Sequence, residues 1–212
     1  MTIRAAIPAL ACALALSACA IGNRYDYSDA SGTLNYKSQG QHVTVAVWDQ
    51  RRYVVSGNKD PDFVGLQRAN VGLPFDVGTA SHRPLAWDMD DALVRSLAAA
   101  DFGATPVMLT PRDSQATAMA ALLRGKPQRV LLLRMDDWES DTYKNPMVTY
   151  DLTLNVYDAS GRRLTSKNLK GNEALQGSLI NPGARAREEV PDTFRRKIEL
   201  LLNAPEVAAA LR

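Results

Sequence analysis

The sequence is poor in the residues that carry most redox, metal and nucleophilic chemistry. Its 212 residues include two cysteines, Cys12 and Cys19, and two histidines, His42 and His82. Both cysteines lie near the start, so residues 20–212 hold no thiol for a disulfide, a cysteine nucleophile or a thiolate zinc site. These chemistries are therefore excluded from most of the chain.

Charge imbalance and nucleotide-binding glycine patterns are also lacking. The formal net charge is +2, from 25 Lys and Arg against 23 Asp and Glu, which gives no electrostatic case for nucleic acid. The sequence has no G-x-S-x-G, no P-loop and no dinucleotide-binding glycine pattern. Ser81 precedes His82, but adjacency does not supply the geometry of a nucleophile and its base. We expect no cofactor and no catalytic residue.

The first residues have the build of a secretory signal. Arg4 is followed by an apolar stretch over residues 5–16 and by the small residues Ser17 and Ala18. The apolar stretch has about a dozen residues, whereas a transmembrane helix needs about 20. We therefore expect residues 1–18 to be a signal peptide and not a lasting membrane span.

The end of this signal carries a more specific motif. Leu16-Ser17-Ala18-Cys19 resembles the lipobox of bacterial lipoproteins. The resemblance implies cleavage before Cys19, acylation of that cysteine, and a membrane anchor of two or three acyl chains. Lipoproteins retained at the inner membrane often carry Asp at the position after the cysteine, so by resemblance Ala20 favours the outer membrane. We expect the anchored domain to face the periplasm. The alternative is ordinary export, with Cys19 incidental.

The rest of the chain divides into a linker and one domain. Residues 20–42 are rich in Gly, Ser, Asn, Asp and Gln and show no helical or strand period. We therefore expect residues 19–42 to form the lipidated cysteine and a flexible tether. Residues 43–212 are long enough to bury one core, so we expect a single domain there.

Hydrophobic patterns in residues 43–212 predict a mixed sheet with helices. Apolar or alternating runs predict strands, and apolar residues at steps of three and four predict helices. Ser81 or Thr79 could cap the first helix, and Asp113 or Ser114 the second. The order β-α-β-α-β-β-β-α indicates an α/β (α+β) fold, a mixed β-sheet packed by helices. The strands are expected at residues 43–48, 103–109, 129–135, 148–157 and 162–169, and the helices at residues 84–101, 114–124 and 190–201.

Two groups of carboxylates need an interpretation. The first follows the strand at residues 129–135, but its spacing does not match a calcium loop, so we expect no metal. It fits a solvated strand end, or a hydrolase site if two carboxyls in a cleft have separated pKa values. The second group is typical of negative charges at the start of a helix. The first group is Asp136, Asp137, Glu139 and Asp141, and the second is Asp88, Asp90 and Asp91.

Residues 49–82 form the most informative segment of the domain. A connection longer than about 12–15 residues is uncommon in a compact domain and is often functional. This one is rich in apolar side chains, which either pack on the sheet or face a partner. Residues 53–56 could form another strand. Phe63, Leu73 and Phe75 are the candidate contact residues.

A family resemblance appears along this segment. Val-Thr-Val-Ala-Val-Trp-Asp-Gln-Arg at residues 43–51 is followed by Phe63-Val64-Gly65 and by Gly-Leu-Pro-Phe at residues 72–75. With the lipobox, this pattern resembles the YajG-type family of uncharacterised bacterial lipoproteins. The resemblance implies acylation of Cys19 and no catalytic residue. The α/β pattern also resembles domains of lipoproteins that assist envelope assembly.

These observations favour a non-enzymatic lipoprotein of the cell envelope. Its domain would bind another envelope component, either a protein or peptidoglycan, while acyl chains hold it at the membrane. Two alternatives stay open. One is a hydrolase that uses the carboxylates around Asp137, and the other is a carrier of a small apolar ligand or lipid, which needs a pocket of about 300 Å³ or more.

Overall fold

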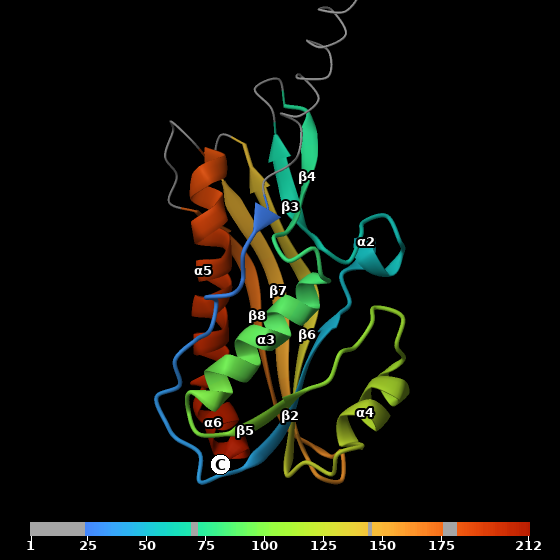
Figure 1. The fold of residues 1–212 in the computed structure, drawn as a ribbon, viewed down its shortest axis with the longest axis vertical. Helices are drawn as coiled ribbons and strands as arrows, with labels where there is room; N and C mark the ends of the chain where they lie inside the picture. Colours follow the sequence, from blue (N-terminus) through green and yellow to red (C-terminus); the bar gives the residue numbers. More distant parts are fainter. Residues whose placement is uncertain (1–23, 69–71, 144–145, 176–181) are drawn as a thin grey trace, which may run out of the picture.

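A computed structural model describes residues 24–68, 72–143, 146–175 and 182–212. The strands are β1 (Arg24–Tyr25), β2 (His42–Asp49), β3 (Phe63–Arg68), β4 (Pro74–Thr79), β5 (Gly103–Pro106), β6 (Arg129–Thr142), β7 (Met147–Asp158) and β8 (Arg163–Ala174). The helices are α2 (Arg52–Val55), α3 (Leu85–Ala98), α4 (Gln115–Leu123), α5 (Pro182–Leu202) and α6 (Pro205–Leu211) (Figure 1).

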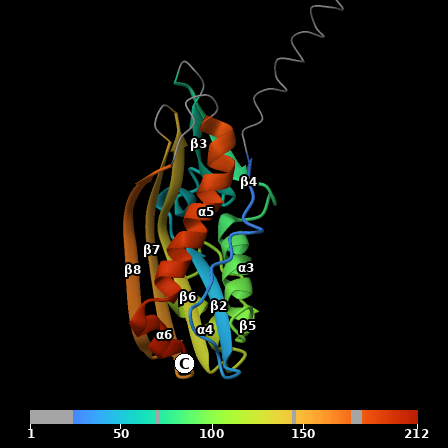
Figure 2. The same cartoon turned by 90° about the vertical axis from the view of Figure 1, so that its left-hand side faces the viewer.

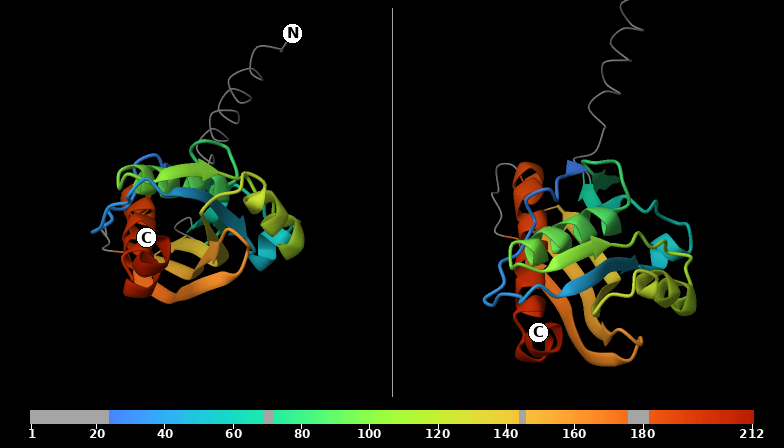
Figure 3. Two further views of the ribbon diagram at one scale, coloured as in Figure 1. Left: turned by 90° about the horizontal axis from the view of Figure 1, so that it is seen from below. Right: turned by 60° about the horizontal axis from the view of Figure 1, so that its bottom comes forward.

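All eight strands belong to one mixed sheet. The order is β1-β4-β3-β6-β2-β5, and β7 and β8 continue from the other edge of β6. The β6–β7 and β7–β8 pairs are antiparallel, whereas β2 pairs parallel with both β5 and β6. End-on views show that the sheet is curled, with α5 along one side and α4 on the opposite side (Figure 3). The predicted mixed sheet packed by helices is confirmed.

Side chains from the two faces of the sheet enter two separate cores. The larger core lies between the sheet and helices α3, α5 and α6, and in Figure 2 α5 lies between β8 on the left and α3 on the right. The smaller core lies under α4 and includes Trp48, Leu122 and Leu132. Val45 and Val47 of β2 face the larger core, whereas Ala46 faces the smaller one. Burial on both faces explains why β2 and the start of β6 are apolar without alternation.

Several predicted elements are observed close to their expected positions. Helix α3 follows the apolar stripe, and β7 and β8 form the predicted hairpin. Ser114 caps α4 by accepting a hydrogen bond from the Thr117 amide. The predicted cap of α3 is wrong, because Pro84 occupies the N-cap position without a side-chain hydrogen bond. Thr79 and Ser81 instead donate to Arg83 O and to Asp88.

Residues 49–82 are not one irregular connection. They form α2, β3 and β4, and β3 and β4 pair as an antiparallel hairpin. Residues 53–56 were expected to be a strand, but Tyr53, Val54 and Val55 belong to α2. The apolar residues of β3 and β4 therefore belong to the sheet. Because they alternate irregularly with glycine and proline, the sequence pattern did not predict these two strands.

The flexible tether predicted for residues 19–42 is contradicted over its described part, residues 24–42. Tyr25 and Tyr27 are fully buried in the larger core, and β1 pairs with β4. Tyr27 Oη accepts a hydrogen bond of 2.8 Å from Trp138 Nε1. The tyrosines, scattered without a period, pack at irregular intervals along an extended segment, so periodicity could not reveal them. We call residues 24–42 the strap.

The strap is also fixed to the C-terminal helices. The Asn35 amide donates to Asn203 Oδ1 at 2.8 Å, and Asn203 Nδ2 donates to Thr33 O at 2.8 Å. Tyr36 Oη donates to Leu202 O at 3.1 Å. The domain therefore includes residues 24–42, ahead of the predicted start at residue 43.

Candidate functional site

A cleft lies beside α2. Its volume is about 540 Å³, which is large enough for a small ligand or for side chains of a partner. One wall comes from residues 54–61, after β2, and the other from the start of α3 and from residues 109–112. The lining is largely apolar and rigid: Val54, Pro61, Pro84, Ala86, Trp87, Leu109 and Pro111.

Local hydrogen bonds hold the walls of this cleft in place. Trp87 Nε1 donates to Leu109 O at 3.2 Å, which ties α3 to the loop after β5. On the other side, the Leu85 amide donates to Pro61 O at 3.0 Å. The cleft is therefore preformed, since both contacts lie within the folded domain.

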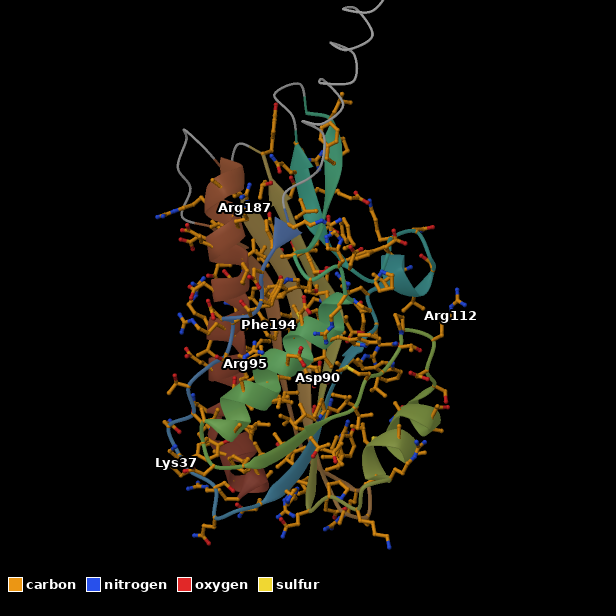
Figure 4. The ribbon with its side chains drawn as sticks, in the orientation of Figure 1. Lys37, Asp90, Arg95, Arg112, Arg187 and Phe194 are labelled. Carbon is orange, nitrogen blue, oxygen red and sulfur yellow. The ribbon has the colours of Figure 1, made fainter. Side chains whose placement is uncertain are left out.

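Charged groups lie at the rim of the cleft. Lys59 Nζ is paired with Asp76 Oδ2 at 2.7 Å, so its charge is offset. Within the part of the chain that the structure describes, the side chains of Arg112 and Asp60 make no hydrogen bond or ion pair. Arg112 extends from the loop after β5 on the side of α2 (Figure 4). The rim thus offers one cation and one carboxylate to a ligand.

The floor of the cleft adjoins a buried ion pair between β2 and α2. Arg51 Nη2 lies 2.7 Å from Asp49 Oδ2, and Arg51 Nε donates to Asp49 Oδ1 at 2.9 Å. The guanidinium also donates to the carbonyls of Phe63 at 2.6 Å and Trp138 at 3.3 Å. We call Asp49 and Arg51, with the backbone groups they hold, the junction.

The junction closes a gap in the sheet. One edge of β6 pairs with β2 up to Met135 and with β3 from Ser140 onward. Between these points the carbonyl of Trp138 accepts from Arg51 and, at 3.1 Å, from Tyr53 Oη. Side chains therefore satisfy a strand edge that the chain leaves open as it passes from β2 to β3.

The structure separates the three residues predicted as a contact surface. Phe63 is 3% exposed, and its ring packs edge-to-face on Tyr53 with centroids 5.5 Å apart. Its assignment to the contact surface is wrong, because the first residue of β3 is buried beside the junction. Leu73 and Phe75 are 60% and 39% exposed at the end of the β3–β4 hairpin. These two residues stay a predicted contact surface. Cys19 lies outside the described residues.

The carboxylates predicted at a strand end lie inside β6, which continues to Thr142. Asp136 pairs with Arg134 at 2.7 Å, and Asp141 pairs with Arg68 at 2.6 Å. Desolvation raises the pKa of both Asp137 and Glu139. The two shifts have the same direction, so this is not a pair with separated pKa values. Within the described ranges, no group of three or more His, Cys, Asp or Glu could hold a metal ion.

Asp90 on α3 is a buried group that the sequence interpretation missed. The sequence predicts a charge at a helix start, but Asp90 is 1% exposed, and neither carboxylate oxygen has a hydrogen-bond partner. Burial first, and then the nearby charge of Asp91, raise its pKa to about 8 against the opposing effect of Arg83. Asp90 lies on α3 (Figure 4). It shares the helical spacing of Ala86, Leu93 and Leu97, so the sequence pattern could have indicated that its side chain is buried.

The described helices include none with the length and apolar content to cross a bilayer. The fold and site define a class: an α+β domain with one curled mixed sheet, an N-terminal strap and a preformed apolar cleft. No family model and no curated protein matches the sequence.

The solved structures that match this chain include an uncharacterised protein and a lipoprotein. Protein XCC0632 of Xanthomonas campestris, of family DUF330, is 13% identical, with 88% of this chain and 93% of that chain covered and a TM-score of 0.54. Lipoprotein GNA1162 of Neisseria meningitidis is 12% identical, with coverages of 78% and 99% and a TM-score of 0.34. The LpoB C-terminal domain of Salmonella enterica is 16% identical, with coverages of 66% and 87% and a TM-score of 0.30. The likeness to XCC0632 shows the fold alone, and the two lower scores carry no argument.

Proposed function

We propose that this protein is a non-enzymatic lipoprotein of the cell envelope, anchored through acylated Cys19 and binding another envelope component through its domain. The lipobox at residues 16–19 supports the anchor, and Ala20 supports an outer-membrane position facing the periplasm. The segment motifs support a relationship to the YajG-type family. The partner is an envelope protein or peptidoglycan.

The preformed cleft is the observation that carries the binding proposal. One of its walls comes from the segment that the sequence singled out, and its apolar walls carry one unpaired charge of each sign at the rim, Arg112 and Asp60. A few placed polar groups around an apolar surface are the usual composition of a binding site. Leu73 and Phe75, at the end of the hairpin, form a second exposed part of the same segment.

A carrier of a small apolar ligand is the second candidate. The cleft volume of about 540 Å³ exceeds the 300 Å³ or so that such a ligand needs. The carboxylate hydrolase has weaker support. The pKa values of Asp137 and Glu139 are shifted in the same direction. Asp136 and Asp141 are each paired with an arginine.

The experiment is crosslinking in cells from the rim of the cleft. A photoreactive amino acid replaces Arg112, and a matched variant carries it in place of Arg124, an exposed arginine at the end of α4. We expect an adduct with one envelope component from position 112 and none from position 124. Cys19→Ala, which removes the acylation site, should weaken the capture because the domain is no longer held at the membrane.

Filling the cleft provides the decisive control. Thr110→Trp places a large side chain at the lining, and Thr105→Trp makes the same change at an exposed position of β5. Thr110→Trp should abolish the adduct and Thr105→Trp should not. An adduct unaffected by Thr110→Trp would contradict binding in the cleft. Release of an apolar molecule from the purified protein by organic solvent, lost in Thr110→Trp, would instead favour the carrier.

A further inference from the structure

Exposed apolar side chains gather at one end of the molecule. The described residues include seven large hydrophobic residues that are exposed, and three of them lie at this end: Leu73, Phe75 and Met147. The end also holds the last residues of β3, β6 and β8 and the first of α5, opposite the C-terminus (Figure 1). We call Leu73, Phe75 and Met147 the apolar end.

Strand register places two of these residues at almost the same height. Met147 of β7 is opposite Asp141 of β6, which pairs with Leu66 of β3, and Leu66 pairs with Asp76 of β4. Phe75 immediately precedes Asp76 on β4. Phe75 and Met147 are thus separated by three strand spacings, or about 14 Å across the sheet. Because neighbouring residues of a strand point to opposite faces, Phe75 and Met147 project from opposite faces of this rim of the sheet.

The charges beside this rim are neutralised in pairs. Arg68 Nη2 lies 2.6 Å from Asp141 Oδ2, and Lys59 Nζ lies 2.7 Å from Asp76 Oδ2. A rim with exposed apolar groups and internally compensated charges suits the zone between lipid headgroups and acyl chains, where apolar burial supplies the attraction.

The direction of β1 allows the proposed anchor to reach the same end. β1 is parallel to β4, with Arg24 opposite Gly78, so the chain arrives at Arg24 from the side of Phe75. From Gly78 to Phe75 the strand covers about 10 Å in that direction. Five residue steps separate Cys19 from Arg24, a reach of about 18 Å at full extension. Since the strap is packed on the domain, no longer linker exists between the anchor and this end.

We propose that the apolar end rests on the phospholipid surface of the membrane that holds the anchor. The inference depends on the proposed acylation of Cys19 and names the occupant of the Leu73 and Phe75 surface as lipid. The C-terminus and the Leu200 side chain, near the end of α5, then face away from the membrane. The cleft, on the flank of the molecule, is left accessible to an envelope partner.

The test measures lipid contact at matched positions. The full acylated protein is reconstituted in vesicles of phosphatidylethanolamine and phosphatidylglycerol, part of which carry bromine on their acyl chains and quench tryptophan. Leu73→Trp is compared with Leu200→Trp, because the two native side chains are equally exposed at 60% and 59%. Phe75→Trp is a second probe of the same surface, and the wild-type emission of the three native tryptophans is subtracted.

We expect quenching in Leu73→Trp and Phe75→Trp and none in Leu200→Trp. Flotation with the vesicles and the mass of the acylated chain report the anchor separately. Absence of quenching at position 73 in a protein that floats overturns the lipid contact and leaves the anchor intact. Equal quenching at positions 73 and 200 also overturns it. A chain without acyl groups that does not float removes both the proposed anchor and this inference.

Discussion

Two aspartates of this domain are buried to the same degree but differ in their hydrogen-bond partners. Asp49 is 2% exposed and is held by the Arg51 guanidinium, whereas Asp90 is 1% exposed and has no hydrogen-bond partner. The first is a structural component that joins β2, α2 and β6. The second is an acid whose charge is disfavoured by its surroundings, so it is protonated at neutral pH. Burial alone therefore does not define the role of a carboxylate here.

The largest effect is expected when the junction loses its cation. Arg51→Met leaves the Asp49 carboxylate buried without a partner, which should lower the free energy of unfolding by about 3–5 kcal/mol, measured by urea denaturation at pH 7. Arg134→Met is the control, because Arg134 and Asp136 are also two residues apart but lie at the surface. That change should cost less than about 1 kcal/mol. Equal costs would mean that the junction does not stabilise the fold.

The next largest effect on stability is expected for Asp90, the buried carboxyl without a hydrogen-bond partner. Asp90→Asn cannot ionise, so at pH 8 it should be more stable than the wild type by about 2–4 kcal/mol, since each unit of pKa shift corresponds to about 1.4 kcal/mol. Asp91→Asn is the control, because Asp91 is paired with Arg83 at 2.8 Å and should lose a little stability. A destabilised Asp90→Asn would show that the carboxylate has a partner in solution.

The pH dependence tests the same contrast in the wild type. Burial raises the pKa of Asp90 to about 8 in the folded state, so between about pH 4 and pH 8 the unfolded chain releases this proton and the folded chain keeps it. The stabilising contribution is complete below pH 4 and is lost as the pH rises to about 8. The wild type should lose roughly 1 kcal/mol per pH unit relative to Asp90→Asn. Parallel pH profiles for the two proteins would contradict the raised pKa.

The smallest effect on stability is expected for the hydroxyl of Tyr53, beside the junction. Tyr53→Phe removes the hydroxyl that donates to Trp138 O at 3.1 Å and leaves the ring against Phe63. The free energy of unfolding should fall by about 1 kcal/mol, the usual net value of one hydrogen bond. Chemical denaturation measures this change. A loss as large as that of Arg51→Met would assign the closure of the sheet edge to the tyrosine instead.

Much of the fold could be predicted because its strongest signals are local. The double-sided apolar runs of β2 and β6, the stripe of α3 and the alternation of β7 each reflect contacts within one element. The strap and the β3–β4 hairpin could not be predicted with the same rules. Their burial depends on partners far along the chain, as Tyr27 meets Trp138 and Asn35 meets Asn203.

The candidate site shows the same limit. Composition pointed to residues 49–82, and the structure places one wall of the cleft there, but the opposite wall comes from Trp87 and Leu109. Phe63 and Phe75 are both phenylalanines within two residues of a proline, and only their places in the sheet bury one and expose the other. The pairing of Arg51 with Asp49 was equally hidden, because two charged residues in sequence usually indicate a solvated surface.

The strap also sets when this protein can fold. Its partners Glu199, Leu202 and Asn203 are synthesised more than 160 residues after it. Contacts of such long sequence separation form late and slow the folding of a domain. The end of α5 must therefore be synthesised before the strap can complete its docking, and until then Tyr25 and Tyr27 are not enclosed as they are in the folded domain.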